Sequence, residues 1–159
     1  MVEIKDRELH RISITAIIYR KTERDFEYLI TRRSMEKKAF PGLWVVPGGG
    51  LEVDDYINTE PSTKEGQWYN AVENSLRREV LEEVNLVVGK LDFLLDITFI
   101  RPDGVPMIIL SYYGPYESGE VELDEDATEF KWVTVEEAKG YDLIDGILGE
   151  IEEVEKRLA

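Results

Sequence analysis

The chain has 159 residues, the length of one domain with a substantial core, and 43% of them are hydrophobic, as in globular rather than disordered proteins. It contains no cysteine, which excludes disulfide bonds, thiolate metal sites and cysteine nucleophiles. Its net charge of -15 argues against a nucleic acid partner, because binding along a nucleic acid backbone requires basic surface stripes.

The N-terminal segment mixes acidic and basic side chains and has no apolar run, so we expect no signal peptide. No stretch approaches the roughly 18 apolar residues of a membrane helix, so we expect no membrane partner. Together with the lack of cysteine, these features predict a cytoplasmic protein. A small phosphorylated partner is compatible with the negative charge, because bound cations can invert the local field.

The N-terminal half of the chain predicts strands and an insertion. Runs rich in β-branched and aromatic residues predict strands over 11–19 and 26–31, and a short apolar strand is expected over 43–46. Pro47 and three glycines should end this strand in a turn where backbone can approach a ligand closely. The polar, turn-rich sequence after it indicates a surface insertion at about 56–69.

The C-terminal half predicts helices around further strands. Apolar residues four apart predict a helix over 68–84, and Asn85 suits its left-handed end. Thr134 should cap a further helix through a capping box, and 146–158 predicts an amphipathic one. Further strands are expected over 91–100, 107–113 and 129–133, the first two forming a hairpin. The whole predicts a mixed sheet with helices on either side and no linker.

Three carboxylates on the first predicted helix, Glu79, Glu82 and Glu83, carry the strongest functional signal. Their spacing makes them neighbours that repel one another. A solvated charged face is the simpler alternative. A helical wheel, however, places Glu79 and Glu83 inside the apolar stripe, with Glu82 at its border and Arg78 opposite. Acids on a core-facing side need a partner or a metal, and oxygen ligands suit Mg²⁺ or Mn²⁺.

The same residues resemble the signature of the Nudix hydrolase family, of the MutT-like kind. Gly49 matches the first glycine of the signature, Asp55 stands where the family usually has glutamate, and 78–83 matches the core in register. Two departures are an insertion of about fifteen residues between Asp55 and Arg78, and Asn85 in place of the final glycine. The resemblance implies an α/β fold, the Nudix-type α/β/α sandwich with a central mixed β-sheet, as a single domain over 1–159.

The resemblance also implies an activity, which is Mg²⁺- or Mn²⁺-dependent cleavage of the diphosphate linkage in a nucleoside diphosphate derivative. Such a substrate would be a nucleoside triphosphate, ADP-ribose or a nucleotide sugar. The alternative is a catalytically silent Nudix-like domain that binds a nucleotide as a sensor, against which the intact glutamates weigh. Family members are often dimers, so a homodimer is compatible with the resemblance.

Roles for individual residues follow from the same resemblance. Glu79 and Glu83 would be the principal metal ligands, with Glu82 bridging metals or acting as the base. The Gly48 carbonyl would be a further ligand, and Arg78 would orient the acids by ion pairing.

Other positions are weaker candidates. The loop before the last strand offers Glu125 or Asp126 as a further catalytic acid. Substrate binding is expected from the glycine turn, where Gly49 and Gly50 leave room for a diphosphate, and from two arginines that could grip phosphates or be ordinary surface residues. These arginines are Arg32 and Arg33.

Overall fold

A computed structural model describes residues 3–159, so Met1 and Val2 of the expected domain lie outside the described residues. The strands are β1 (Arg11–Lys21), β2 (Phe26–Arg33), β3 (Trp44–Val45), β4 (Gly48–Gly50), β5 (Val87–Val88), β6 (Asp92–Ile100), β7 (Pro106–Ser118) and β8 (Ala127–Val133). The helices are the 3₁₀ turn η1 (Val53–Asp55), α1 (Ala71–Val84), α2 (Val135–Ala138) and α3 (Ile147–Leu158).

The strands form one mixed sheet. Its path runs β3-β2-β1-β7-β5, while β4 pairs with β1, β6 with β7 and β8 with β2. The pairing of β1 with β7 is parallel and every other pairing is antiparallel. The strand β1 can occupy the centre because its run of β-branched and aliphatic residues suits burial on both faces.

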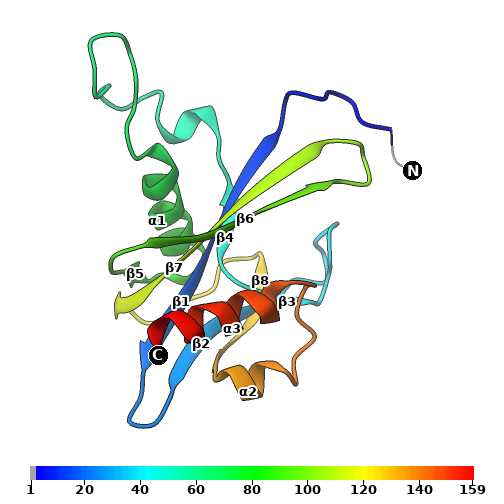
Figure 1. Cartoon of the computed structure of the whole chain (residues 1–159), viewed down its shortest axis with the longest axis vertical. Coiled ribbons are helices and arrows are strands. Elements are labelled where there is room, and N and C mark those ends of the chain that lie inside the picture. Colours follow the sequence, from blue (N-terminus) through cyan, green and yellow to red (C-terminus); the bar gives the residue numbers. More distant parts are fainter. Residues whose placement is uncertain (1–2) are drawn as a thin grey trace.

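Helices cover both faces of this sheet, as Figure 1 shows. Alternate residues of β1 point to opposite faces, so Ile14 and Ile18 pack with α1 while Ile17 packs with α3. On α1 the buried apolar residues are Leu76, Val80 and Val84, in agreement with the helical wheel. The predicted sandwich of helices around a mixed sheet is confirmed. None of the helices within residues 3–159 is long and apolar enough to cross a membrane.

The predicted glycine turn is in fact a strand. Gly48, Gly49 and Gly50 form β4 and pair antiparallel with Thr15, Ile14 and Ser13 of β1. The prediction was wrong because Pro and Gly usually break strands. Here the backbones of β4 and β1 approach so closely that a residue without a side chain is required. A Cβ on Gly48 would lie 2.2 Å from the carbonyl oxygen of Ile14.

The start of α1 also differs from the prediction. Asn70 adopts the left-handed conformation at φ 61°, so the helix begins at Ala71 rather than at Trp68. The Trp68 indole instead packs on Tyr56 and donates a hydrogen bond to the carbonyl of Thr59, at 3.0 Å. The inserted segment therefore closes on itself through its own aromatic residues, and in Figure 1 it projects beyond the N-terminal end of α1.

The ends of two helices form as expected. Asn85 has the left-handed conformation at φ 60°, which terminates α1. Thr134 caps α2 by accepting a hydrogen bond from the Glu137 N–H, and the Glu137 carboxylate accepts one from the Thr134 N–H. Besides β4, the sequence prediction also lacked the short strand β5, which pairs with the end of β7.

Candidate active site

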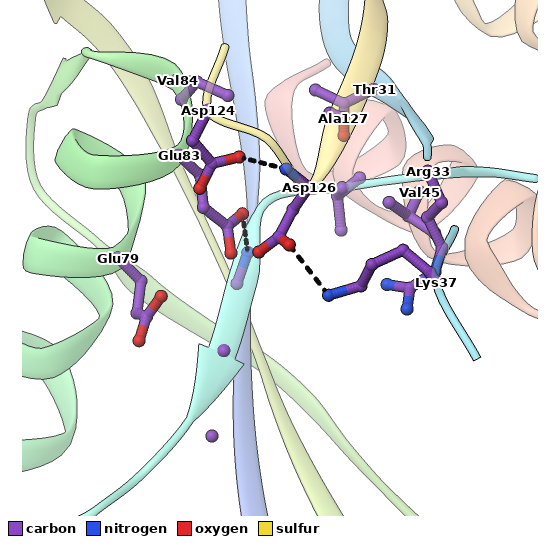
Figure 2. Close-up of a pocket in the computed structure, with 14 residues that line it drawn as sticks. Thr31, Arg33, Lys37, Val45, Glu79, Glu83, Val84, Asp124, Asp126 and Ala127 are labelled. Carbon is purple, nitrogen blue, oxygen red and sulfur yellow. Dashed lines mark hydrogen bonds and ion pairs between the residues drawn. The ribbon is translucent and has the colours of Figure 1, made fainter. Parts of the chain in front are cut away.

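A cavity of about 310 Å³ opens between α1, β4, the end of β2 and the loop before β8. Figure 2 shows acidic side chains from α1 and from this loop on one side of the cavity and two cationic side chains on the other. The lining residues are Thr31, Arg33, Lys37, Val45, Val46, Gly48, Gly49, Gly50, Glu79, Glu83, Val84, Asp124, Asp126 and Ala127. The cavity therefore brings together the glycine strand, part of the acidic helix and one of the two predicted arginines.

Glu83 lies at the inner wall of the cavity. Its carboxylate accepts a hydrogen bond from the Gly48 N–H, at 3.2 Å. Burial is the main reason that the pKa of Glu83 is raised to about 8; the Gly48 bond lowers it, and the nearby carboxylates of Glu79, Asp124 and Asp126 raise it. In this structure the N–H of Gly48, rather than its carbonyl, is the group that contacts the acid.

Arg78 pairs with three acids on and beside α1. Its guanidinium pairs with Glu79 at 3.2 Å, with Glu82 at 2.9 Å and with Asp55. The Glu79 side chain is 19% exposed and lines the cavity, whereas Glu82 is 56% exposed and lies outside it. Burial also raises the pKa of Glu79. The wheel therefore separated the two inward glutamates from the outward one.

Asp55 keeps its place beside the helix despite the inserted residues. Its side chain is 6% exposed and accepts hydrogen bonds from the Ser75 hydroxyl at 2.9 Å and the Glu52 N–H at 2.8 Å, besides pairing with Arg78. Burial opposes ionisation, but these bonds outweigh it and the pKa of Asp55 is lowered. The insertion consequently loops out without detaching Asp55 from the helix.

The loop before β8 contributes two acids, but not the one named first. Asp124 and Asp126 line the cavity, whereas Glu125 is exposed and does not. The loop is fastened to α1 by a hydrogen bond from the Asp124 N–H to the Glu83 carbonyl, at 3.2 Å. The sequence contained the acidic run but no signal for which of its members turn inward, so Asp124 was missed.

The opposite wall is cationic. Arg33 lines the cavity and donates from Nε to the Ala39 carbonyl at 2.9 Å. Arg32 points elsewhere, because adjacent strand residues face opposite sides, and it pairs with Glu129 at 2.9 Å. Lys37, which the sequence interpretation did not single out, also lines the cavity and pairs with Asp126 at 3.0 Å.

This lining suits a hard divalent cation. Four carboxyl groups and two cations line it, which is an excess of two negative charges when all four acids are ionised, and carboxylate oxygens are ligands that Mg²⁺ and Mn²⁺ prefer. As they stand, no three His, Asp or Glu side chains within residues 3–159 converge closely enough to hold a metal. Binding would therefore require Glu79, Glu83 and the loop acids to turn toward one another.

The stability of the metal-free protein should depend on pH through Glu83. Its pKa is about 8 in the folded protein, against an ordinary value of 4.5, so the folded state binds more protons than the unfolded state between these values. The free energy of unfolding should therefore fall as pH rises from about 5 to about 8. A divalent cation bound by Glu83 would compete with that proton, so its stabilising effect would grow over the same range.

Thermal unfolding in EDTA and in MgCl₂ across this pH range checks both trends. Glu83→Gln is the control, because it removes this titrating group and should reduce the pH dependence; the pKa values of Glu79, Asp124 and Glu150 are also raised by burial, so part of the dependence should remain. A metal-free protein whose unfolding temperature rises between pH 5 and pH 8 would contradict the burial of Glu83.

Comparison with known proteins places this chain in a family. Residues 9–149 match the family described as the NUDIX domain, and the chain belongs to the Nudix family. The predicted family and enzyme class, a Nudix pyrophosphohydrolase acting on a nucleotide-type substrate, are thereby confirmed.

Two curated relatives carry the same name. The chain is 29% identical over 126 residues to nucleoside triphosphatase NudI of Klebsiella pneumoniae (strain 342), which covers 73% of this chain and 79% of that protein. It is 27% identical over 131 residues to nucleoside triphosphatase NudI of Escherichia coli (strain K12), covering 76% of this chain and 82% of that protein.

Solved structures share the fold. The NUDIX domain of Shewanella oneidensis NrtR, in a cocrystal structure with ADP ribose, superimposes with a TM-score of 0.74 at 17% identity and covers 96% of this chain and 91% of that one. The MutT protein from Methanosarcina mazei Go1 gives a TM-score of 0.68 at 24% identity, covering 96% and 99%. At these identities the likeness concerns the fold alone.

Proposed function

We propose that this protein is a Mg²⁺- or Mn²⁺-dependent pyrophosphohydrolase that cleaves nucleoside triphosphates, and that residues 1–159 form one Nudix domain. The observation that carries the proposal is the cavity in which four carboxylates face two cations. This arrangement has acids for a divalent cation on one wall and positive charge for a polyphosphate on the other. The printed names of the two relatives support a nucleoside triphosphate over ADP-ribose or a nucleotide sugar.

The proposed metal ligands are Glu79 and Glu83, assisted by Asp124 or Asp126 and by the carbonyl of Gly48. A bound divalent cation would neutralise diphosphate oxygens and lower the pKa of an attacking water. Arg78 would position Glu79 through their ion pair. The glycine strand would leave room for the diphosphate, since Gly49 and Gly50 present no side chain to the cavity.

The catalytic base would come from an acid that already faces the cavity. Asp124 and Asp126 meet this condition, and Glu125 would need the loop to rearrange. Glu82 would have to break its ion pair with Arg78 before it could bridge metals or accept a proton. The favoured base is therefore a carboxylate of the loop before β8.

The proposal is tested by incubating the purified protein and Mg²⁺ or Mn²⁺ with nucleoside triphosphates, ADP-ribose and nucleotide sugars. Cleavage of the linkage between a nucleoside monophosphate and its substituent should turn a triphosphate into the monophosphate and pyrophosphate. Saturable binding of a nucleotide with no product from any compound would overturn the hydrolase and favour the sensor.

A further inference from the structure

The pair formed by Lys37 and Asp126 is an exchangeable contact at the cavity wall. The Lys37 ammonium lies 3.0 Å from the Asp126 carboxylate, and the two side chains are 34% and 47% exposed. An ion pair with this much solvent contact contributes little to stability. The ion pair can therefore break, with little loss of stability, when a ligand binds Lys37 or Asp126.

Lys37 lies on the side of the cavity across from Glu79 and Glu83. In Figure 2 the Asp126 carboxylate lies between Glu83 and the Lys37 ammonium, and Lys37 approaches from the same side as Arg33. A polyphosphate held by a metal at Glu79 and Glu83 would extend across the cavity toward this wall. Arg33 and Lys37 are the two cationic residues that line the cavity, so they are the groups available to that part of the substrate.

The side chains of Arg33 and Lys37 differ in how freely they can move. Arg33 is fixed in part by its bond to the Ala39 carbonyl, whereas Lys37 has a flexible stem and three donors on a compact charge. Its ion pair is with a carboxylate, and a phosphate oxygen can replace that carboxylate with a similar charge-assisted hydrogen bond. The Lys37 ammonium can thus exchange its carboxylate partner for a phosphate oxygen of the substrate while it stays in the cavity.

We propose that Lys37 is a substrate-binding residue that pairs with Asp126 in the free protein and with the substrate's diphosphate in the complex. The transfer releases Asp126 toward Glu83, where it can act as an additional ligand or base. This inference rests on the proposed function, since it assumes a diphosphate in the cavity. Lys37 would bind the phosphate that lies at the cationic wall of the cavity, across from the acids that hold the metal.

The test compares Lys37→Met with Lys38→Met, which removes the same charge from the exposed neighbouring position. For nucleoside triphosphate hydrolysis, Lys37→Met should raise KM about tenfold or more and change kcat less, because a charge-assisted contact is lost. Lys38→Met should leave KM within about twofold. Calorimetric titration with inorganic pyrophosphate and Mg²⁺ should show the same difference in Kd without requiring turnover.

Two further measurements separate binding from packing. Thermal unfolding of Lys37→Met should match that of the unsubstituted protein, because the ion pair is exposed. Lys37→Arg, which keeps the charge, should bind pyrophosphate more tightly than Lys37→Met. Equal weakness of these two variants would indicate a packing role and overturn the assignment.

The outcomes for the two proposals can be told apart. Unchanged KM and unchanged Kd in Lys37→Met, or no pyrophosphate binding by the unsubstituted protein, would overturn the role of Lys37 even if hydrolysis is observed. Weaker pyrophosphate binding by Lys37→Met, in a protein that hydrolyses no nucleotide, would support Lys37 while overturning the hydrolase.

Discussion

Replacement of Glu83 by glutamine is expected to lower kcat by about three orders of magnitude while the protein stays folded. Glutamine has the same shape, and its amide oxygen can still accept the hydrogen bond from Gly48. It has no negative charge with which to hold a divalent cation beside Glu79. The loss should therefore concern metal-dependent chemistry rather than structure, and steady-state hydrolysis with circular dichroism would measure both.

The same substitution should not destabilise the metal-free protein. Burial and three neighbouring carboxylates raise the pKa of Glu83 to about 8, which means that its ionised form is disfavoured in the fold. A neutral side chain removes that cost, so the unfolding temperature in EDTA above pH 8 should be unchanged or higher. Glu73→Gln is a suitable control, since Glu73 lies on the same helix and pairs with Arg77. Wild-type turnover in Glu83→Gln would remove Glu83 from the metal site.

Gly48→Ala is expected to destabilise the fold by about 3 kcal/mol, at the upper end of the cost of overpacking. The added methyl group would lie 2.2 Å from the Ile14 carbonyl oxygen and 2.8 Å from the Thr15 Cα. Both atoms belong to the backbone of the central strand, which cannot move without disturbing its parallel pairing with β7. Chemical denaturation of the purified variant would give the change in the free energy of unfolding.

Gly49→Ala is the matched comparison, because the same added methyl group meets a different neighbour. It would lie 2.5 Å from the Glu79 carboxyl carbon, which is the end of a flexible side chain. The carboxylate can move away, so stability should change by less than about 1 kcal/mol. Displacing Glu79 should nevertheless lower kcat at least about tenfold. If Gly48→Ala and Gly49→Ala lose the same stability, the cost does not depend on whether the added methyl group meets backbone or a flexible side chain.

The fold could be predicted well where periodicity and composition agree. The strands β1 and β2 are buried on both faces and appear in the sequence as runs of β-branched and apolar residues. Asn85 and Thr134 marked helix ends because their side chains suit those particular backbone conformations. The strand β4 could not be predicted, since three glycines carry no pattern and its pairing depends on contact with β1.

The candidate site was predictable only on the helix. Helical geometry fixes which side of α1 Glu79, Glu82 and Glu83 occupy, so the wheel could separate the inward acids from the outward one. The loop before β8 has no such regularity, and its position depends on a contact distant in sequence, the hydrogen bond from the Asp124 N–H to the Glu83 carbonyl. Lys37 reaches the cavity from an irregular loop between β2 and β3, which no local sequence pattern could have indicated.

The acids of this cavity are proposed to support metal-dependent cleavage of a nucleoside triphosphate. The most direct measurement is to identify the products formed from a nucleoside triphosphate by the purified protein, with Mg²⁺ and with EDTA. We predict nucleoside monophosphate and pyrophosphate in Mg²⁺, and no product in EDTA or with Glu83→Gln. Equal product formation in EDTA would contradict the dependence on metal, and saturable nucleotide binding with no cleavage in Mg²⁺ would contradict the hydrolase activity.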